Sequence, residues 1–398
     1  PTGRIVLDGG DVRFTPGASL AMLDAVDYNS GTLALDSLFI NLEGADLNVD
    51  DLPPFTVFES RLANGSISGD AANLFVADAT FEGIALTASE VGVRDQLTLR
   101  SYTGPVFTTS TVVGTRFYDD GPPDSPAYVA LGGRTVIEDV ETEIDLWLAD
   151  ADSGGPTVVG TLSLQNGASV QSGFGSTLRL AEDASINGGQ INLAMFRSLE
   201  LIGTGTGAVS LNTDVIVGES AALTSSQLND LFLTGALVNN GGDVELLSNR
   251  LLLFGDVDLN GGFTELGGSS LMTNAGSITI DGGAILSIQG THDARFVESV
   301  EREGEGRIML DGFLSNLGTT LTLDEDTQDI WLDGAISGGR IEAADGQEVY
   351  LESVSGLGSS GIGRGSLSGV TLTTDLELRY NGRRTSLNIS DGLILEDA

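Results

Sequence analysis

Residues 233–246 read LTGALVNNGGDVEL, and residues 253–266 read LFGDVDLNGGFTEL. The two stretches are 20 positions apart, and the Leu, Gly, Asn-Gly-Gly, Glu and Leu positions coincide between them. An Asp-Gly-Gly at 281–283 follows 21 positions later, and related units stand at 187–189 and 337–339. Recurrence at a nearly fixed spacing of about 20 residues indicates a repeat fold in which each unit is one layer.

Short runs of alternating apolar and polar residues fill the space between these glycine pairs. Alternation with a period of two places every second side chain on the same face, which is typical of a half-buried β-strand. Patterns with a helical period are nearly absent, so we expect an all-β fold. The clearest predicted strands are residues 31–35, 161–164, 178–180, 277–280 and 320–323.

A unit of about 20 residues with two or three short strands suits one coil of a right-handed parallel β-helix, or β-solenoid. Coils of this kind bury their apolar faces only when they stack, so strands across residues 230–290 should pair in parallel. The Asn-Gly-Gly units are expected at the corners, because Gly and Asn adopt positive φ at little cost. A β-sandwich or barrel is the alternative, but its hairpin turns would not recur in one register.

The spacing of the repeat changes along the chain. It is regular from about residue 160, whereas the first 150 residues keep the strand pattern and lose the even spacing. We therefore expect an irregular β-rich region with longer loops over residues 1–155, continuous with a regular solenoid over residues 156–398. A length of 398 residues predicts on the order of 18 coils at about 20 residues each.

The later repeats resemble those of a known class of proteins. The stretches DLEL at 375–378, TSLNI at 385–389 and DGLIL at 391–395, with the Asn-Gly-Gly units, look like the strand repeats of bacterial secreted surface proteins. That class includes autotransporter passengers and filamentous-haemagglutinin-type adhesins. The resemblance covers about residues 160–398. It implies a secreted or cell-surface β-helix with an adhesive or architectural role, and it carries over no functional residue.

The charge of the chain limits its partners. There are 57 acidic residues against 18 basic ones, all of them Arg, and the net charge is −39. Binding to nucleic acid requires clustered basic residues, and an anionic bilayer would repel this chain. Divalent cations, cationic surfaces and neutral glycans stay compatible with it. Cys is absent, which excludes disulfides and thiol chemistry, and no apolar run reaches the length of a membrane span.

Carboxylate clusters are the candidate metal ligands, because Ca²⁺ binds six to eight oxygen atoms and loops with several Asp residues can supply them. We expect weak Ca²⁺ binding, with solvated acidic loops as the alternative. The first candidates are Asp150 and Asp152, and the others are Asp119, Asp120 and Asp124. A further acidic group comprises Asp324, Glu325, Asp326 and Asp329.

Residues for catalysis are scarce. His292 is the only histidine and stands in a charged stretch, where we expect a surface side chain and no catalytic triad. The charged stretch 293–303 is predicted to form a short helix or a protruding loop. Trp147 and Trp331 each lie in an apolar alternation and are expected to pack rather than to line a sugar-binding groove. We therefore expect neither catalytic nor cofactor-binding residues.

Both ends of the sequence still read as strand, at residues 5–7 and 393–395, without an amphipathic capping helix. A solenoid with open ends exposes unpaired strand edges. We expect either a fragment of a longer protein or head-to-tail stacking, and we favour an extracellular structural protein, a filament or surface-layer subunit. A glycan- or host-binding adhesin is the first alternative. A polysaccharide lyase or glycosidase, which needs opposed carboxylates, is the second.

Overall fold

The structure is a computed structural model of the 398-residue chain. It describes residues 5–14, 26–70, 73–102, 109–122, 126–132, 134–148, 155–273, 276–344, 346–351, 363–379 and 385–396. About 65% of the chain is strand and 2% is helix, which confirms the all-β class. The chain divides into two compact units. Unit 1 comprises Pro1–Asn192 and Ser198–Gly205, and unit 2 comprises Leu193–Arg197 and Thr206–Ala398.

Unit 1 is built from short strands and one 3-10 turn, η1 (Val49–Asp51), among its described residues. Its strands are β1 (Ile5–Phe14), β2 (Val26–Asp36), β3 (Phe39–Asn41), β4 (Asp46–Asn48), β5 (Phe55–Phe58), β6 (Arg61–Gly69), β7 (Leu74–Ala77), β8 (Ala79–Ala88), β9 (Glu90–Val93), β10 (Gln96–Arg100), β11 (Thr111–Val113), β12 (Arg116–Asp119), β13 (Tyr128–Leu131), β14 (Val136–Thr142), β15 (Asp145–Leu148), β16 (Thr157–Leu164), β17 (Ser169–Ser172), β18 (Ser176–Leu180), β19 (Ser185–Leu193) and β20 (Ser198–Gly203).

Unit 2 has the same construction, with one short helix, α2 (Ala294–Glu298), in the part of the chain that is described. Its strands are β21 (Ala208–Val217), β22 (Ala222–Ser226), β23 (Asp230–Leu233), β24 (Leu237–Leu253), β25 (Val257–Thr273), β26 (Ile278–Ile280), β27 (Ile285–Ile288), β28 (Thr291–Asp293), β29 (Val300–Arg302), β30 (Arg307–Leu310), β31 (Phe313–Ser315), β32 (Thr320–Leu323), β33 (Ile330–Leu332), β34 (Ala335–Ser337), β35 (Arg340–Ala343), β36 (Val349–Leu351), β37 (Gly363–Leu372), β38 (Leu376–Leu378) and β39 (Thr385–Leu395).

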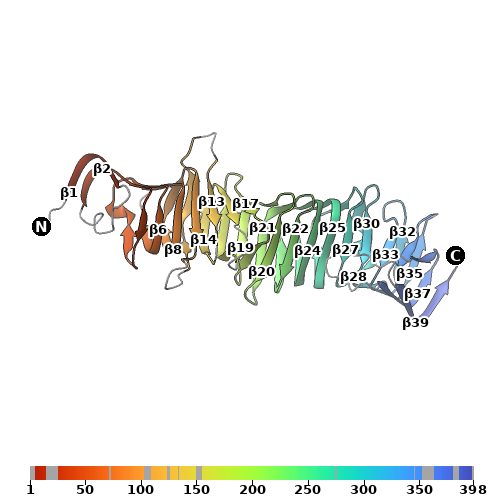
Figure 1. Cartoon of the computed structure of the whole chain (residues 1–398). Helices are drawn as coiled ribbons and strands as arrows, with labels where there is room; N and C mark the ends of the chain where they lie inside the picture. The colour runs from red at the N-terminus through yellow and green to blue at the C-terminus, as the bar shows by residue number, and fades with distance from the viewer. Residues whose placement is uncertain are drawn as a thin grey trace. The chain divides into compact units, whose positions relative to one another are not determined.

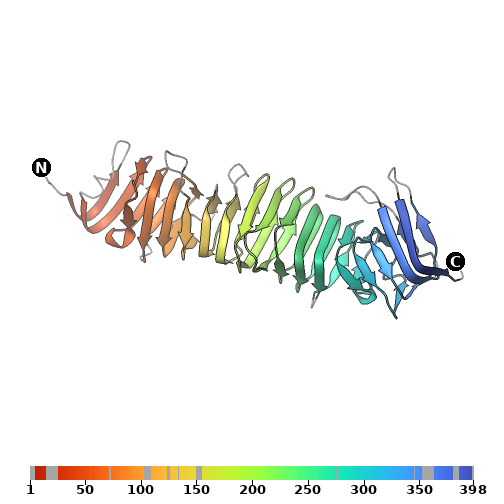
Figure 2. The same ribbon diagram turned by 90° about the horizontal axis from the view of Figure 1, so that it is seen from below.

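The strands pair in parallel with the strands of the next coil, which confirms the predicted β-solenoid. β23 pairs with β24, and β24 pairs with β25 in the register that the sequence repeat predicts, with Leu246 opposite Leu266. Coils follow one another about 22 residues apart, which confirms the expected spacing of roughly 20 residues, and they number about 15, fewer than the 18 expected. Figures 1 and 2 show the stacking within each unit, for example β6 beside β8 and β24 beside β25.

The core of each unit consists of columns of apolar side chains that stack from coil to coil. One column of unit 1 runs through Leu33, Phe55, Leu74, Val91 and Phe117, each at most 1% exposed. These residues alternate with outward-facing neighbours because successive side chains of a strand point to opposite faces. Complete burial of each such side chain contributes about 1.5–3 kcal/mol relative to exposure. The fold therefore rests on the interior face of each coil.

The predicted corners are confirmed for glycine, but the expected role of asparagine was wrong. Gly188, Gly262 and Gly338 have positive φ values of 69°, 73° and 71°. The asparagines of the Asn-Gly-Gly units, Asn240 and Asn260, have no positive φ. Asn239, which precedes the first of these units, lies within β24 and is completely buried. Its Nδ2 donates to Thr264 Oγ1 at 2.9 Å, and its Oδ1 accepts from the backbone of Gly242 at 2.8 Å. The amide thus satisfies backbone groups that the corner leaves unpaired.

Asn239→Ala is therefore expected to lower the free energy of unfolding of unit 2 by about 2 kcal/mol, because it leaves buried backbone donors without an acceptor. Urea unfolding followed by Trp331 fluorescence in a Trp147→Phe background reports on unit 2 alone. Asn240→Ala is the matched control, since the Asn240 side chain is exposed and its Oδ1 accepts a hydrogen bond from Asn260 Nδ2 at 3.0 Å. Equal effects of the two substitutions would contradict the role of Asn239.

Glycines of unit 2 also form a column in which successive coils approach too closely for any side chain. A Cβ at Gly235 would lie 2.1 Å from Thr213 O, and one at Gly255 would lie 2.1 Å from Gly235 O. The series continues at Gly276, where a Cβ would lie 1.9 Å from Gly255 O. None of these glycines has positive φ, so the requirement comes from close backbone approach and not from an unusual conformation.

Three expectations about single residues can be compared with the structure. The helix predicted within 293–303 is confirmed by α2, whose first turn is capped by Asp293. His292 was wrongly placed on the surface: it is 8% exposed and opposite Leu314, because it occupies the inward position of β28. Trp331 is buried as expected, but Trp147 is 41% exposed, since its neighbours Leu146 and Leu148 take the inward positions of β15.

Candidate functional site

Unit 1 has a groove on the outer face of β2, β5 and β7, with a volume of about 570 Å³. Its floor is built from residues in register. Ala34 lies opposite Thr56, and Thr56 lies opposite Phe75. In the neighbouring column Phe58 lies opposite Ala77. Small side chains beside large aromatic ones on adjacent strands leave the space that forms the groove. We call it the β2–β7 groove.

Local sequence explains why these side chains face outward. Val57 and Val76 fill inward positions of β5 and β7 and are at most 1% exposed. Phe58 and Phe75, each next to one of these valines, must therefore lie on the outer face, where both are half-buried. Two phenylalanines on an outer face are costly to hydrate, so they favour contact with an apolar surface of a ligand or partner.

Gly92 makes room for the aromatic side chains at one side of the groove. It lies opposite Phe75 and opposite Tyr118 in the strands on either side. A Cβ at Gly92 would lie 2.9 Å from Phe75 Cδ1 and 3.0 Å from Tyr118 Oη. Any larger residue would therefore push one of the two rings away. Glycine at this position lets both rings keep their places on the sheet.

The rim of the β2–β7 groove carries two ion pairs. Arg13 Nη2 lies 2.7 Å from Asp36 Oδ2, and Arg94 Nη2 lies 2.9 Å from Asp120 Oδ2. The arginine side chains are 59% and 56% exposed, so each pair stabilises the fold by at most about 1 kcal/mol. The pairs instead hold planar hydrogen-bonding groups at the edge of an aromatic floor. Such a combination of apolar walls and a few oriented polar groups is typical of ligand sites.

Of the predicted calcium ligands, Asp119 and Asp120 lie within the described residues. Asp120 pairs with Arg94, and Asp119 accepts a hydrogen bond from Gly121 N at 2.7 Å. Asp124, Asp150 and Asp152 lie outside the described residues. Within the described ranges, no group of three or more His, Cys, Asp or Glu side chains has the geometry of a metal site. Calcium binding stays a prediction from the sequence.

In the third acidic group, Asp324 and Asp329 accept hydrogen bonds from backbone amides. Asp324 Oδ1 accepts hydrogen bonds from Asp326 N at 3.0 Å and from Thr327 N at 2.9 Å. These bonds lower the pKa of the Asp324 carboxyl, because they stabilise its charged form. Asp329 Oδ1 accepts from Glu348 N at 2.7 Å. Both carboxylates thus hold turns between strands.

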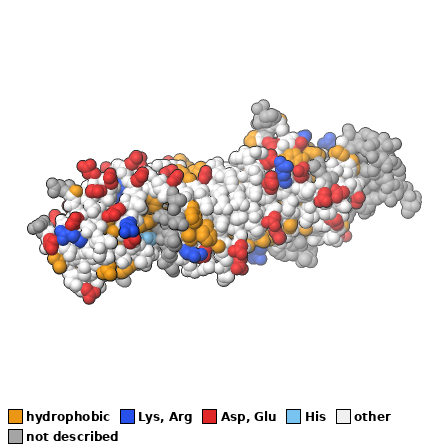
Figure 3. Space-filling view, turned by 180° about the vertical axis from the view of Figure 1, so that it is seen from behind, with side chains coloured by type: hydrophobic (Ala, Val, Ile, Leu, Met, Phe, Trp, Pro, Cys, Tyr) orange, Lys and Arg blue, Asp and Glu red, His pale blue; other side chains and the backbone are white. Residues whose placement is uncertain are grey.

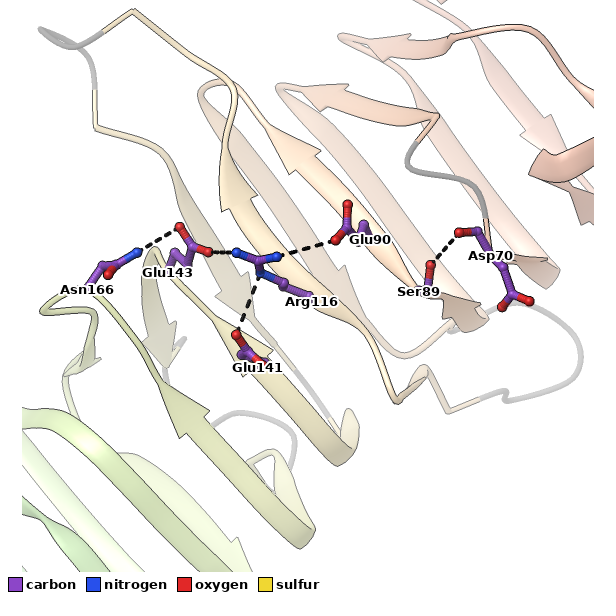
Figure 4. A network of polar contacts seen from close by, with 7 residues as sticks. All are labelled: Asp70, Ser89, Glu90, Arg116, Glu141, Glu143 and Asn166. Carbon is purple, nitrogen blue, oxygen red and sulfur yellow. Dashed lines mark hydrogen bonds and ion pairs between the residues drawn. The ribbon is translucent and has the colours of Figure 1, made fainter.

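A separate cluster in unit 1 surrounds Arg116, which Figure 4 shows between three glutamates. Its guanidinium pairs with Glu143 and lies 3.4 Å from Glu90 and 3.6 Å from Glu141. Glu143 also accepts from Asn166 Nδ2 at 2.9 Å. The ion pair with Glu143 raises the pKa of Arg116 and lowers the pKa of Glu143. One cation shared by three carboxylates links the coils of β9, β12 and β14, which is a structural role.

Unit 2 carries a row of two carboxyls joined by an amide. Gln289 Nε2 donates to Glu265 and, at 3.3 Å, to Asp311 Oδ2. Glu265 is 7% exposed and lies opposite Glu245 of the preceding coil. Burial raises the pKa of Glu265 to about 7, and burial together with Asp333 raises that of Asp311 to about 6. The row therefore takes up protons on folding near neutral pH.

An arginine occupies an inward position of the same unit. Arg302 lies opposite Ile280 and is 8% exposed, and one of its nitrogens donates to the carbonyl oxygen of Asp329. Its Nε and Nη2 have no hydrogen-bond partner within the described part of the protein. Burial lowers the pKa of Arg302 to about 10, and the group stays charged at neutral pH. The sequence offers no signal for this burial beyond the alternation with Val300.

A smaller cavity of about 300 Å³ lies in unit 2 between Arg307, Trp331, Tyr350 and Arg379. The rings of Trp331 and Tyr350 stack with centroids 5.2 Å apart. Arg307 Cζ lies 5.1 Å from the Trp331 ring centroid, and Arg379 Cζ lies 3.7 Å from that of Tyr350. Both rings are 7% exposed, so the arginines cover the aromatic faces that a ligand would need.

Charge is spread over the surface and is not gathered at one site. On the face in Figure 3 the red carboxylate side chains are scattered widely, and blue arginines are few. Several described arginines are neutralised by neighbouring carboxylates, as Arg61 and Arg100 are by the buried Glu82. The surface therefore repels polyanions in general, and any binding must depend on local chemistry.

Sequence reasoning missed the β2–β7 groove because its residues lie in the part with irregular repeats. The comparisons supply no further guide: no protein-family model, no curated protein and no solved structure matches the chain. Among the described helices, none has the length and apolar content that crossing a bilayer requires. The β2–β7 groove is the candidate site, because it combines partly open aromatic rings with oriented polar groups, whereas the arginines of the unit 2 cavity cover its aromatic faces.

Proposed function

We propose that this protein is an extracellular structural protein in which stacked coils form a scaffold. The observation that supports the proposal is the ladder itself, in which parallel strands continue from coil to coil over columns of buried apolar side chains. One such column in unit 2 comprises Leu246, Leu266, Ile288, Leu310 and Leu332, each at most 2% exposed. Stability in such folds comes mainly from contacts between neighbouring coils, so a long surface can be built from one repeated unit.

A bacterial cell-surface location is part of the same proposal. It depends on the resemblance to secreted β-helical surface proteins and on the composition. A chain with 57 acidic residues, no Cys and no Lys is compatible with salty surroundings, where charge repulsion is screened within about 10 Å. Cell fractionation of the source organism with an antibody to unit 2 tests the location. Recovery only from the cytoplasmic fraction would contradict it.

Head-to-tail association is the second element of the proposal, and β39 supports it. Ile389 and Leu395 lie opposite the buried Leu367 and Leu372 and so continue two core columns. They are nevertheless 49% and 59% exposed. A strand that offers both hydrogen-bonding groups and apolar side chains at its edge is a template for a further strand. We infer that a second copy supplies this strand where no further coil of the same chain does.

The chain is therefore expected to gain mass with concentration in sedimentation equilibrium at 0.5 M salt, where repulsion between acidic copies is screened. The double variant Ile389→Asp/Leu395→Asp should stay monomeric, because association would bury two charged side chains at the contact. Ile394→Asp is the matched control: Ile394 is 56% exposed on the other face of β39, opposite Thr371. A wild-type chain that is monomeric at every concentration and salt would overturn the association.

A glycan- or host-binding adhesin is the second candidate function, and the β2–β7 groove favours it. The polysaccharide-enzyme alternative fits less well. Glu265 and Asp311 are the described carboxyls with the largest shifts toward neutral pH, and both bond the amide of Gln289. Glu265 is only 7% exposed, whereas an acid catalyst must reach the bond that it protonates. We therefore propose no catalytic role for this row.

A further inference from the structure

The β2–β7 groove has the size of a small-molecule site. Its volume of about 570 Å³ lies within the range of about 300–1,000 Å³ that such sites span. It crosses strands of successive coils, which present equivalent positions at intervals of about 4.8 Å. A ligand that extends along the stack thus meets Thr56 and then Phe75, which occupy one column on neighbouring strands. The groove suits an elongated ligand made of short units.

The floor of the groove favours flat, partly apolar ligand surfaces. Phe58 and Phe75 are half-buried, so their rings are held by the sheet while part of each stays open. Ala34 and Ala77 beside them add no polar atoms. A pyranose ring offers a patch of C–H groups on its face, and such a patch packs against an aromatic ring without losing hydrogen bonds to water. Anionic groups gain nothing from this floor.

The rim supplies hydrogen bonds of both kinds. A guanidinium only donates and a carboxylate only accepts, and the pair Arg94–Asp120 places the two together at 2.9 Å. The pair Arg13–Asp36 likewise places a donor beside an acceptor, at 2.7 Å. Neighbouring hydroxyl groups of a sugar both donate and accept, so each ion pair matches a pair of hydroxyls. Thr56 adds a hydroxyl on the floor.

The charge of the chain selects against anionic ligands. Each rim arginine is already paired with an aspartate, so the rim has no net charge. The chain as a whole carries −39, which repels anionic glycans and nucleic acid. A peptide strand fits poorly as well, because the backbone of β5 already pairs with β2 on one side and β7 on the other. Peptides that add to a sheet need a free strand edge.

We propose that the β2–β7 groove binds a neutral oligosaccharide, with Phe58 and Phe75 contacting sugar rings and Arg94 and Asp120 bonding sugar hydroxyls. This inference goes beyond the structural proposal, since a scaffold needs no ligand. It stands whether or not copies of the chain associate. The site would let the scaffold attach to a polysaccharide surface.

Isothermal titration of the whole 398-residue chain tests the site. The probes are neutral hexasaccharides of glucose, N-acetylglucosamine, mannose and xylose, with hexagalacturonate as the acidic probe of equal length. We expect at least one neutral probe to bind with a Kd below 1 mM and hexagalacturonate to bind at least 10-fold more weakly. Phe75→Ala and Arg94→Ala should each weaken binding at least 10-fold, because one removes a ring contact and the other a donor.

Phe174→Ala is the matched control, since Phe174 is 60% exposed in the same unit and lies outside the groove. It should bind like the wild type. Circular dichroism must show unchanged melting for each variant. The proposal is overturned if no neutral probe binds, if hexagalacturonate binds most tightly, or if Phe75→Ala and Arg94→Ala bind as the wild type does. Sedimentation of the same samples tests association separately, so the two failures are distinguishable.

Discussion

Replacing Glu265 with Gln is expected to stabilise unit 2 by about 2 kcal/mol at pH 7.5 and by much less at pH 4.5. Burial raises the pKa of this carboxyl from 4.5 to about 7. One pKa unit corresponds to about 1.4 kcal/mol, so the ionised folded state is penalised by about 3 kcal/mol. Part of the gain is lost because the new amide adds a buried donor. The substituted amide oxygen still accepts the bond from Gln289.

The pH dependence follows from the direction of the shift. Between about pH 4.5 and 7 the folded state binds more protons at Glu265 than the unfolded state does, so stability falls as pH rises through this window. Asp311, with a pKa raised from 3.8 to about 6, adds to the fall in the lower part of the window. Above pH 7 the contribution of Glu265 is constant. The Glu265→Gln variant should therefore lose less stability between pH 4.5 and 7.5.

Urea unfolding at several pH values, followed by Trp331 fluorescence in the Trp147→Phe background, measures this difference. Glu301→Gln is the control: it removes one negative charge from unit 2 at an exposed position, and it accounts for the general repulsion in an acidic chain. We expect it to change stability by less than about 0.5 kcal/mol. An equal change in stability between pH 4.5 and 7.5 for the wild type and Glu265→Gln would show that Glu265 is not protonated on folding.

Gly255→Ala is expected to lower the free energy of unfolding of unit 2 by about 3 kcal/mol. The added Cβ would lie 2.1 Å from Gly235 O and 2.5 Å from its carbonyl carbon, so two coils must move apart. Overpacking of this kind costs about 1–3 kcal/mol or more, because neighbouring backbone cannot give way as a side-chain tip can. The lower entropy of an unfolded chain with Ala offsets less than about 1 kcal/mol of this.

Gly261→Ala is the matched control for this prediction. Gly261 lies in β25, six positions after Gly255, and has no positive φ; a Cβ there would have Gly241 Cα as its nearest contact, at 3.3 Å. It should change the urea midpoint far less than Gly255→Ala does. If the two substitutions have equal effects, close approach of the coils does not explain the glycine column.

The parallel stacking could be predicted from sequence because identical residues recur at the positions that pair. Leu246 and Leu266, and Glu245 and Glu265, stand 20 positions apart and lie opposite each other. The inward residues were also predictable, since alternation alone assigns them. The same alternation would have placed Trp147 outward and His292 inward, had it been given more weight than the hydrophobic character of Trp or the charged neighbours of His.

The β2–β7 groove, by contrast, could not be predicted from the sequence. Ala34, Thr56 and Phe75 form one column of the groove, but 22 positions separate the first pair and 19 the second. No fixed period brings such residues together, so only the register of the folded strands does. The sequence also does not predict which outward-facing side chains are buried: Glu265 occupies an outward position, yet it is 7% exposed. Its neutral-range pKa follows from surroundings that are distant in sequence.

Parallel pairing of the strands does not depend on the number of residues between them. Leu97 pairs with Val129, 32 positions later, whereas Val129 pairs with Leu146 only 17 positions later, and both pairs lie in continuous parallel registers. Evolution can therefore lengthen or shorten the connections between strands without disturbing the strands themselves. A single-residue insertion inside a strand has the opposite effect, since it turns every following side chain to the wrong face. Mutational tolerance should thus alternate along the chain, high between strands and low within them.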